Sequence, residues 1–374
     1  MQAAAPAGVA GQTYGLGDLL RAMLASDASD VYVRVGTKPL FRIANEVQQS
    51  AFAAPDRDSV EALVAPALTE THREQLRTTG HVDVAYSETG LGRFRINVYH
   101  QRGTAALVIR RVRSRIPSFE TLHLPPGIGE FALAPRGLVL VTGPAASGKS
   151  TTLAAMVDYR NRHRHGHIIT VEDPIEYLHA DQLSAVSQRE VGTDTESFAA
   201  ALRGAPRQAP DVLVIGEMRD SDSAAAAVHF AETGHLLLGT LHALNASQGL
   251  ERMLHLLPAD SEDGAQARRL AAALVAIISQ RLVPRADAPG LVPAVEVLRA
   301  TPRVRELIRR GELPQLRQTM SEAHDAGMQT FDDALYGLFR RGLITMETCL
   351  DAAQSPGDLR MRLRAFSPTG RSPN

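Results

Sequence analysis

The residues with the clearest chemical potential lie between Gly143 and Ser150, in the sequence GPAASGKS. This stretch fits the phosphate-binding pattern G-x-x-x-x-G-K-[ST]. It follows the apolar run LVLVT and precedes a helix-forming segment, which is the strand–loop–helix context that such a loop requires. We therefore predict a nucleotide site in which backbone N–H groups surround the phosphates and the helix N-terminus adds positive potential.

The side chains of this segment have separate predicted roles. Lys149 reaches the outer phosphates, the Ser150 hydroxyl binds Mg²⁺, and Thr151 faces the α-phosphate. Only two of the 40 cationic residues are lysines, which suggests that Lys149 is under chemical constraint. Ala145 and Ala146 occupy the middle of the loop, where the pattern does not demand glycine, so we expect binding to survive. The predicted ATP-binding residues are Gly143, Ser147, Gly148, Lys149, Ser150 and Thr151.

Two glutamates follow apolar runs that are typical of buried strands. Glu217 comes after DVLVIG, and Gly216 occupies the position at which many P-loop enzymes carry a metal-binding aspartate. We therefore expect Glu217 to act on Mg²⁺ through its water shell or to position the attacking water. Glu172 ends the run IITVE, where a carboxylate near the phosphates could orient or deprotonate water. The alternative for Glu172 is a solvated loop acid.

His235 and His242 stand at the two ends of the apolar run LLLGTL. A single histidine in such a place is more often a satisfied core residue than a ligand. Two histidines flanking one strand beside a P-loop could instead sense the γ-phosphate. The residues alone leave both interpretations open.

Two arginines are predicted to face each other in a β-hairpin. Residues 92–112 alternate between apolar and polar types, and a turn at Arg102-Gly103 would pair positions whose numbers sum to 205. Arg95 would then lie opposite Arg110, an arrangement of like charges that is destabilising unless an anion intervenes. The two are either a solvated pair or arginine fingers aimed at the nucleotide of a neighbouring subunit, which would require an oligomer.

Composition excludes several classes of protein. Lys and Arg total 40 against 41 Asp and Glu, so no net field directs the chain to nucleic acid. With Cys349 as the single cysteine, a disulfide framework and a tetracysteine zinc site are both excluded. The N-terminus does not resemble a signal peptide, and the apolar stretch 270–278 is far shorter than a membrane span of about 20 residues. We expect a soluble, cytoplasmic protein.

The pattern along the chain predicts an α/β protein with two domains. Short alternating runs mixed with helical segments such as 56–78 suggest a small α+β domain, and later strand-like runs alternating with helices favour a parallel sheet covered by helices. After about residue 246 the pattern is mostly helical. The predicted boundaries are a flexible N-terminus over 1–17, the α+β domain over 18–113, a linker with a short helix over 114–137, the second domain over 138–365, and a flexible tail over 366–374.

Segments spread over nearly the whole chain resemble the secretion-ATPase superfamily, specifically the type IV pilus retraction ATPases (PilT/PilU). They include HIITVEDPIEY, PDVLVIGEMRD, AETGHLLLGTLHALNA, TPRVRELIRRGE and GMQTFDDALYGLFRRGLIT, beside the P-loop itself. HIITVEDPIEY with QREVG, GMQTFDDAL and the closing DLRMRLR resemble the PilU members more than the PilT members. The chain departs from the family at Ala145-Ala146, where Thr-Gly is usual. It departs again at Gly204 and Pro206, which should end a helix near Arg203.

The resemblance implies a PAS-like N-terminal domain, a RecA-like ATPase domain with a helical C-terminal part, and a hexameric ring. It makes Glu172 the general base, Glu217 the Walker B glutamate, and His235 and His242 histidine-box residues. It also implies that two arginines of the N-terminal domain, Arg95 and Arg110, reach the nucleotide. TPRVRELIRRGE matches a C-terminal helix motif required for retraction. ATP hydrolysis with Mg²⁺ would turn an inner-membrane platform protein, with the ring attached peripherally to that membrane.

Other functions remain possible on the sequence alone. A pilus-extension or type II secretion ATPase usually carries a tetracysteine zinc insertion and a longer N-terminal region, so one cysteine and a compact N-terminal domain argue against this alternative. An accessory nucleotide-binding subunit with little turnover is favoured by the altered loop and Pro206, whereas the full set of expected catalytic residues favours turnover. The sequence leaves open whether a second retraction ATPase takes part.

Overall fold

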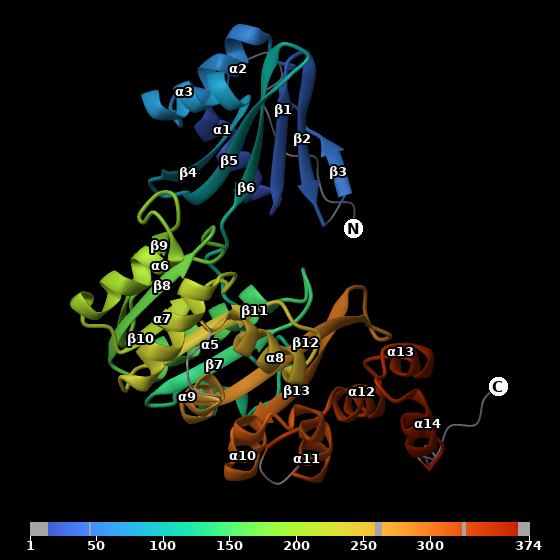
Figure 1. Cartoon of the computed structure of the whole chain (residues 1–374). Helices are drawn as coiled ribbons and strands as arrows, with labels where there is room; N and C mark the ends of the chain where they lie inside the picture. The colour runs from blue at the N-terminus through green and yellow to red at the C-terminus, as the bar shows by residue number, and fades with distance from the viewer. Residues whose placement is uncertain (1–13, 45, 259–263, 324–326, 366–374) are drawn as a thin grey trace, which may run out of the picture. The chain divides into compact units, whose positions relative to one another are not determined.

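The computed structural model describes residues 14–44, 46–258, 264–323 and 327–365, which form two compact units (Figure 1). The first unit extends to Arg115 and includes Glu176–Leu178, and the second comprises Ile116–Ile175 and the chain from His179 onward. The flexible segments predicted at 1–17 and 366–374 lie mostly outside the described residues. Within the first of them, however, Leu16 is buried and begins a helix.

The first unit is a six-stranded antiparallel sheet with three helices. The bounds of its elements are α1 (Leu16–Ala25), β1 (Asp30–Arg34), β2 (Thr37–Ile43), β3 (Glu46–Gln49), α2 (Arg57–Val64), α3 (Glu70–Thr79), β4 (His81–Glu88), β5 (Gly92–Gln101) and β6 (Thr104–Arg111). The strand order is β3-β2-β1-β6-β5-β4. Alternating residues such as Phe94, Ile96 and Val98 point to one face of the sheet, where they form a core with Leu19 and Val60 of the helices.

The predicted hairpin register is confirmed. β5 and β6 pair antiparallel with Arg95 opposite Arg110, and the chain turns at Arg102 and Gly103, which both have positive φ. The helical segment expected over 56–78 is two helices, α2 and α3. They are separate because Asp56 and Thr69 each cap a new helix start with a side-chain oxygen.

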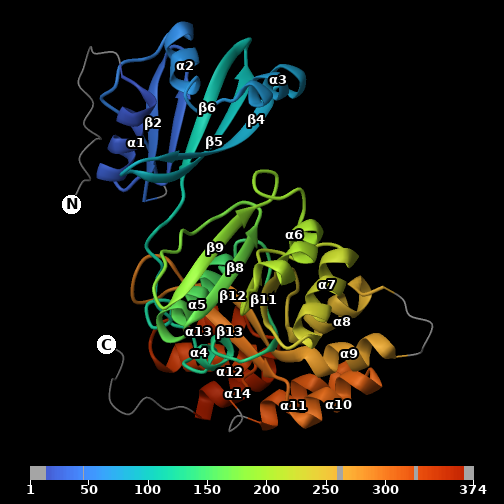
Figure 2. The same cartoon turned by 90° about the vertical axis from the view of Figure 1, so that its left-hand side faces the viewer.

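The second unit contains a seven-stranded sheet whose strands are all parallel except the last. Its strands are β7 (Gly137–Thr142), β8 (Gly166–Glu172), β9 (Ser184–Glu190), β10 (Val212–Ile215), β11 (Leu236–Leu241), β12 (Leu274–Pro284) and β13 (Leu291–Arg299). Their order is β13-β12-β7-β11-β10-β8-β9, with only β13 antiparallel to its neighbour, so β8 and β9 lie at one edge (Figure 2). The predicted parallel sheet is confirmed.

Helices cover both faces of this sheet, because side chains of successive residues in a strand point to opposite sides. Val139 and Val141 of β7 pack with α4 (Ile128–Ala132) and α5 (Lys149–His163). Leu138 and Leu140 face the other helices. These are α6 (Phe198–Gly204), α7 (Ser221–Glu232), α8 (Ala246–Leu256), α9 (Ala265–Ala273), α10 (Pro302–Arg310) and α11 (Leu316–Glu322), with 3-10 turns at Ala205–Gln208 and Leu313–Gln315.

Two features of the second unit bear on the sequence predictions. α6 ends at Gly204, one residue after the predicted Arg203, and a 3-10 turn containing Pro206 follows. The segment expected to be a linker contributes Phe119, Ile128 and Phe131 to the core beside α5. The domain boundaries themselves stay a prediction.

The expectation of a mostly helical chain after about residue 246 is wrong for residues 274–299, which form the hairpin of β12 and β13. The apolar run LAAALVAII crosses the boundary, because α9 ends at Ala273 and β12 begins at the next residue. A uniformly apolar run has no distinguishing period, so its pairing with β7 and β13 decides the conformation.

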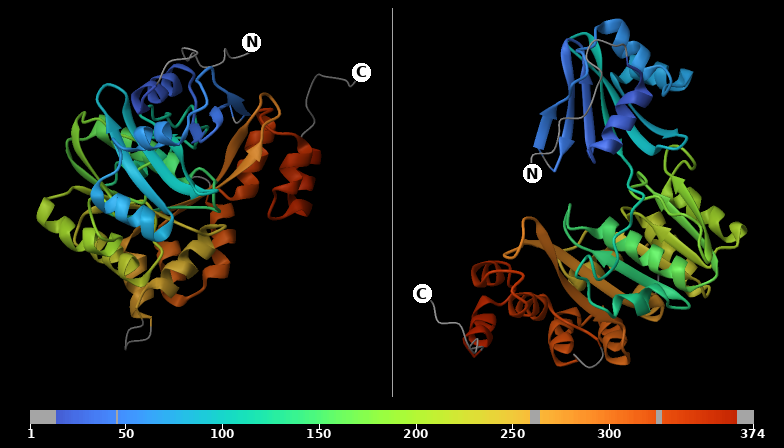
Figure 3. Two further views of the ribbon diagram at one scale, coloured as in Figure 1. Left: turned by 90° about the horizontal axis from the view of Figure 1, so that it is seen from above. Right: turned by 180° about the vertical axis from the view of Figure 1, so that it is seen from behind.

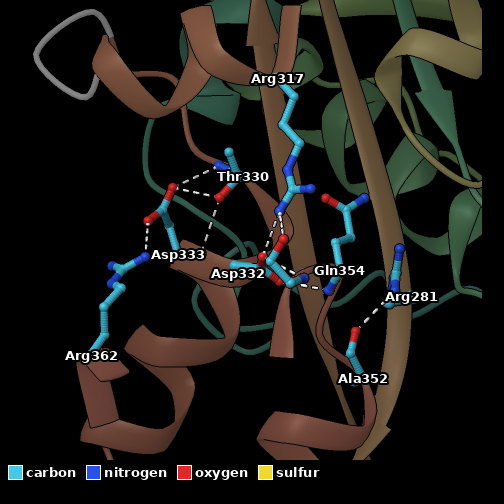
Figure 4. Close-up of polar contacts among 9 residues, drawn as sticks. Arg281, Arg317, Thr330, Asp332, Asp333, Ala352, Gln354 and Arg362 are labelled. Atoms are coloured by element: carbon cyan, nitrogen blue, oxygen red, sulfur yellow. Dashed lines mark hydrogen bonds and ion pairs between the residues drawn. The ribbon is translucent and has the colours of Figure 1, made fainter. Parts of the chain in front are cut away.

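Three C-terminal helices pack beside this hairpin, namely α12 (Phe331–Arg340), α13 (Met346–Asp351) and α14 (Pro356–Ala365) (Figure 3). The buried carboxylate of Asp332 accepts hydrogen bonds from the backbone N–H groups of Gln354 and Ser355 and pairs with Arg317 at 2.9 Å (Figure 4). Arg281 of β12 donates to the carbonyl of Ala352 at 3.0 Å. None of the described helices is long and apolar enough to cross a bilayer.

Candidate active site

The P-loop connects the carboxyl end of β7 to the N-terminus of α5, as predicted. Gly143 and Gly148 both have positive φ, and a β-carbon at either one would press on Gln280 of the neighbouring strand β12. At Gly143 the added carbon would collide with the Gln280 carbonyl oxygen and with Ser147 Oγ, and at Gly148 it would lie 2.9 Å from Gln280 Nε2. Gly143 is therefore required by close packing against backbone as well as by its conformation, and Gly148 chiefly by its conformation.

Lys149 lies folded over the loop that precedes it. Its Nζ donates to the carbonyls of Gly143 at 3.0 Å and Pro144 at 2.8 Å, and its side chain is largely buried. The same Nζ is 3.5 Å from Nδ1 of His242, the residue that follows β11. The lysine ammonium thus lies inside the concave loop, where an outer phosphate would meet it.

The loop has the features that an anionic phosphate requires. The Ser147 hydroxyl is buried and, within the described residues, has no hydrogen-bond partner. An ammonium lies in the loop, and the N-terminus of a 15-residue helix follows. A buried donor without an acceptor is costly, and a phosphate oxygen is the acceptor that such a donor set fits. The residues present therefore fit a nucleotide.

Glu217 is the centre of a polar chain at the carboxyl ends of β10 and β11. Its Oε1 lies 2.7 Å from His242 Nε2, and its Oε2 lies 2.7 Å from Arg219 Nε. Arg219 also approaches Asp173 at 3.7 Å. Hydrogen bonding to Glu217 raises the pKa of Arg219. The two ring nitrogens of His242 therefore face Lys149 on one side and Glu217 on the other.

Glu172 ends β8 and is held in place by two donors. The Thr170 hydroxyl donates to its Oε1 at 2.7 Å, and Gln188 Nε2 donates to the same oxygen at 3.1 Å. A β-carbon at Gly216 would lie 3.2 Å from the Glu172 Cα, so an aspartate at that position would push against Glu172. A larger residue at Gly216 would therefore require the end of β8 to shift by a few tenths of an ångström.

His235 does not join this group. It precedes β11 and its carbonyl accepts from the N–H of Gly137 at the start of β7, whereas His242 and the P-loop follow the opposite ends of these strands. A six-residue strand spans about 20 Å, so one chain cannot bring both histidines to the same phosphate. Instead the His235 ring stacks on Phe230 at 4.6 Å, which fits the alternative of a satisfied structural histidine.

The two predicted arginines lie in the first unit. Arg110 Nε donates to Asp30 at 2.7 Å, which together with Coulomb attraction raises the pKa of this guanidinium, and Arg95 Nε approaches Asp83 at 3.3 Å. Carboxylates on the adjacent strands thus offset the opposed positive charges. Because both arginine side chains remain partly exposed, at 42% for Arg95 and 67% for Arg110, they can still meet an anion.

Sequence reasoning missed one residue that contacts the P-loop. Gln280 on β12 is 2% exposed, donates from Nε2 to the Ser147 carbonyl at 2.6 Å and accepts from the Thr152 hydroxyl at 2.8 Å. Its neighbour Ser279 accepts from Thr142 at the end of β7. The only sequence signal was a polar Ser-Gln pair after an apolar run that was interpreted as helical.

Comparison with known proteins agrees with this geometry. Residues 17–328 match the family described as "Type II/IV secretion system protein". The chain is 43% identical to the type IV pilus ATPase PilU of Pseudomonas aeruginosa over 93% of this chain and 91% of that protein. It is 37% identical to the same organism's PilT, described as a "Type IV pilus retractation ATPase", over 91% of this chain and 98% of PilT.

The structure is also similar to a solved one. The crystal structure of the pilus retraction motor PilT with bound ADP superimposes with a TM-score of 0.84 at 38% identity, covering 93% of this chain and 99% of the other. This similarity confirms the predicted fold class, an N-terminal domain followed by a RecA-like ATPase domain. From its P-loop, its fold and these relatives, the chain belongs to the PilT/PilU family of type II/IV secretion ATPases and is a pilus motor ATPase.

Proposed function

We propose that this protein powers type IV pilus retraction as a hexamer that hydrolyses ATP and drives pilus disassembly at an inner-membrane platform protein. The observation that supports it most is the meeting of Lys149, His242 and Glu217 beside the P-loop, in a chain related to PilU and PilT over most of its length. The ring would be attached to the cytoplasmic side of the membrane through that platform.

In the proposed reaction each residue has a distinct task. Lys149 turns from the carbonyls of Gly143 and Pro144 to the outer phosphates, and the loop N–H groups bind the remaining phosphate oxygens. Glu172, oriented by Thr170 and Gln188, accepts the proton of the attacking water.

Mg²⁺, when bound, neutralises charge on the phosphates. Ser150, in the first turn of α5, would hold it directly, and Glu217 would hold it through water. His242 links Lys149 to Glu217, so it can report whether an outer phosphate has drawn Lys149 away.

The test of turnover is steady-state phosphate release by the purified protein, with the mass of the oligomer measured in parallel. Mg²⁺-dependent release by a hexamer is expected, and Glu217→Ala should lower it at least about 100-fold. Glu251→Ala, the same change at an exposed position of α8, is the matched control and should leave release unchanged. Tight ATP binding by the wild type without turnover would instead favour the accessory-subunit alternative.

The direction of the motor needs a cellular measurement. Cells whose only copy is Glu217→Ala are expected to keep surface pili and to lose retraction, observed as loss of twitching with normal or increased piliation. Loss of surface pili in these cells would contradict retraction and support pilus extension.

A further inference from the structure

The strand that sequence reasoning missed places one buried side chain against the phosphate-binding loop. β12 runs parallel to β7 with Ser279 beside Thr142, and it continues for five residues after β7 has ended. Gln280 is the first residue of that extension. It therefore lies alongside the loop 143–148, which starts at the same level of the sheet.

Both ends of the Gln280 amide are occupied. The Ser147 carbonyl can only accept a hydrogen bond, so the amide nitrogen must face it, and this fixes the amide oxygen toward the Thr152 hydroxyl. The side chain thus connects the P-loop to the first turns of α5. With 2% exposure, Gln280 offers water little chance to replace either bond.

Holding the Ser147 carbonyl also determines where the next N–H points. In a planar trans peptide the carbonyl oxygen and the following N–H lie on opposite sides. Because the Ser147 carbonyl is directed outward to Gln280, the N–H of Gly148 is directed away from β12, into the loop. A row of inward N–H groups is what binds phosphate in such a loop.

We infer that Gln280 is a positioning residue of the ATPase: it holds the Ser147–Gly148 peptide in the orientation that binds the nucleotide phosphates. The inference rests on the nucleotide site proposed above. Without Gln280 the Ser147 carbonyl is left buried and unpaired, and the peptide can rotate. Affinity should then fall for ligands that place a β-phosphate in the loop and stay nearly constant for ligands that do not.

The experiment measures ADP and AMP affinities by competition with a fluorescent ADP analogue. Gln280→Met keeps the length of the side chain and removes both hydrogen bonds, and Gln280→Leu removes both with a second apolar side chain. Each should weaken ADP binding about tenfold and lower the ratio of ADP to AMP affinity by a similar factor. Thr152→Val, which leaves the Ser147 contact intact, should change the ratio less than threefold.

A matched control separates positioning from general loss of structure. Gln329 makes the same kind of bond, from Nε2 to the Val295 carbonyl at 2.7 Å, in another part of the second unit. Gln329→Met should lower thermal stability to a similar extent and leave the ADP to AMP ratio unchanged. A ratio within twofold of wild type in a folded Gln280→Met or Gln280→Leu protein would overturn the inference. Absence of nucleotide binding by the wild type would instead overturn the proposed function.

Discussion

Ala146 is the residue at which this P-loop carries measurable strain. Its φ of 58° is a left-handed conformation, which costs residues with a β-carbon about 1–2 kcal/mol. Ala145, its neighbour in the loop, does not have a positive φ, and both side chains are exposed. The loop therefore keeps its shape with alanine where glycine would adopt the same conformation without strain.

This strain predicts opposite effects for two neighbouring substitutions. Ala146→Gly removes the strain of the left-handed conformation and should not lower the free energy of unfolding. Ala145→Gly only adds freedom to the unfolded chain, so it should lower the free energy of unfolding by about 0.5–1 kcal/mol. Denaturant titration should separate the two variants by about 1 kcal/mol or more. Equal values would mean that Ala146 is not strained.

At the scale of elements, β12 and β13 connect the P-loop to the C-terminal helices. Along β12, Gln280 contacts the loop and the next residue, Arg281, lies over the Phe331 ring of α12 at 3.9 Å. On β13, Glu296 is 1% exposed and accepts from the N–H of Ala246, the first residue of α8. Since α8 follows the loop that carries His242, Glu296 fixes the far end of that loop.

Burial raises the pKa of Glu296 to about 7, against the opposing effects of the N–H groups of Ala246 and Phe331 and of Arg281 and Arg317. Between about pH 4.5 and 7 the folded chain therefore holds a proton at Glu296 that the unfolded chain releases, so this residue makes stability fall as pH rises. Glu296→Gln keeps a neutral acceptor at every pH.

The stability of Glu296→Gln relative to wild type is expected to rise by about 2–3 kcal/mol between pH 4.5 and 8, measured by denaturant titration at each pH. His179, whose pKa burial lowers to about 4, has the opposite pH dependence. Because wild type and Glu296→Gln share His179, its contribution cancels in the difference between their free energies of unfolding. A stability difference that does not change with pH would contradict a raised pKa at Glu296.

In the whole molecule, the predicted site residues are divided between the two units. Glu172, Glu217, Lys149 and His242 belong to the second, and the paired arginines belong to the first. Arg110 also neutralises Asp30, a buried carboxylate, so replacing it would disturb the first unit itself. Arg95 pairs with the exposed Asp83, which makes it the cleaner position for testing a role in catalysis.

If Arg95 acts on the nucleotide of a neighbouring subunit, two inactive variants should rescue each other. Lys149→Ala removes phosphate binding, and Arg95→Gln removes the arginine. In mixed oligomers, some interfaces therefore place the intact Lys149 site of an Arg95→Gln subunit opposite the intact Arg95 of a Lys149→Ala subunit. Mixing subunits is expected to restore part of the phosphate release, with each variant alone near background. Arg93→Gln, a change on the same strand, is the control and should remain active. No rescue in confirmed mixed oligomers would exclude action between subunits.

Short-range patterns in the sequence predict the local features of the candidate site. The P-loop and its place between a strand and a helix follow from short-range pattern, and the pairing of Arg95 with Arg110 follows from a period of two on both sides of one turn. The position of Glu172 and Glu217 near the P-loop could be predicted because parallel strands end at a common edge of the sheet.

The remaining features depend on contacts between segments that are distant in the sequence. Residues 274–299 are strands because β7 offers an edge to pair with, a long-range contact that an unpatterned apolar run does not reveal. The separation of His235 from His242 follows once the strand between them is known to be extended and continuous. Gln280 becomes part of the site only because β12 lies beside β7, 138 residues away in sequence at Thr142, and side-chain contacts between such distant segments have no local signature.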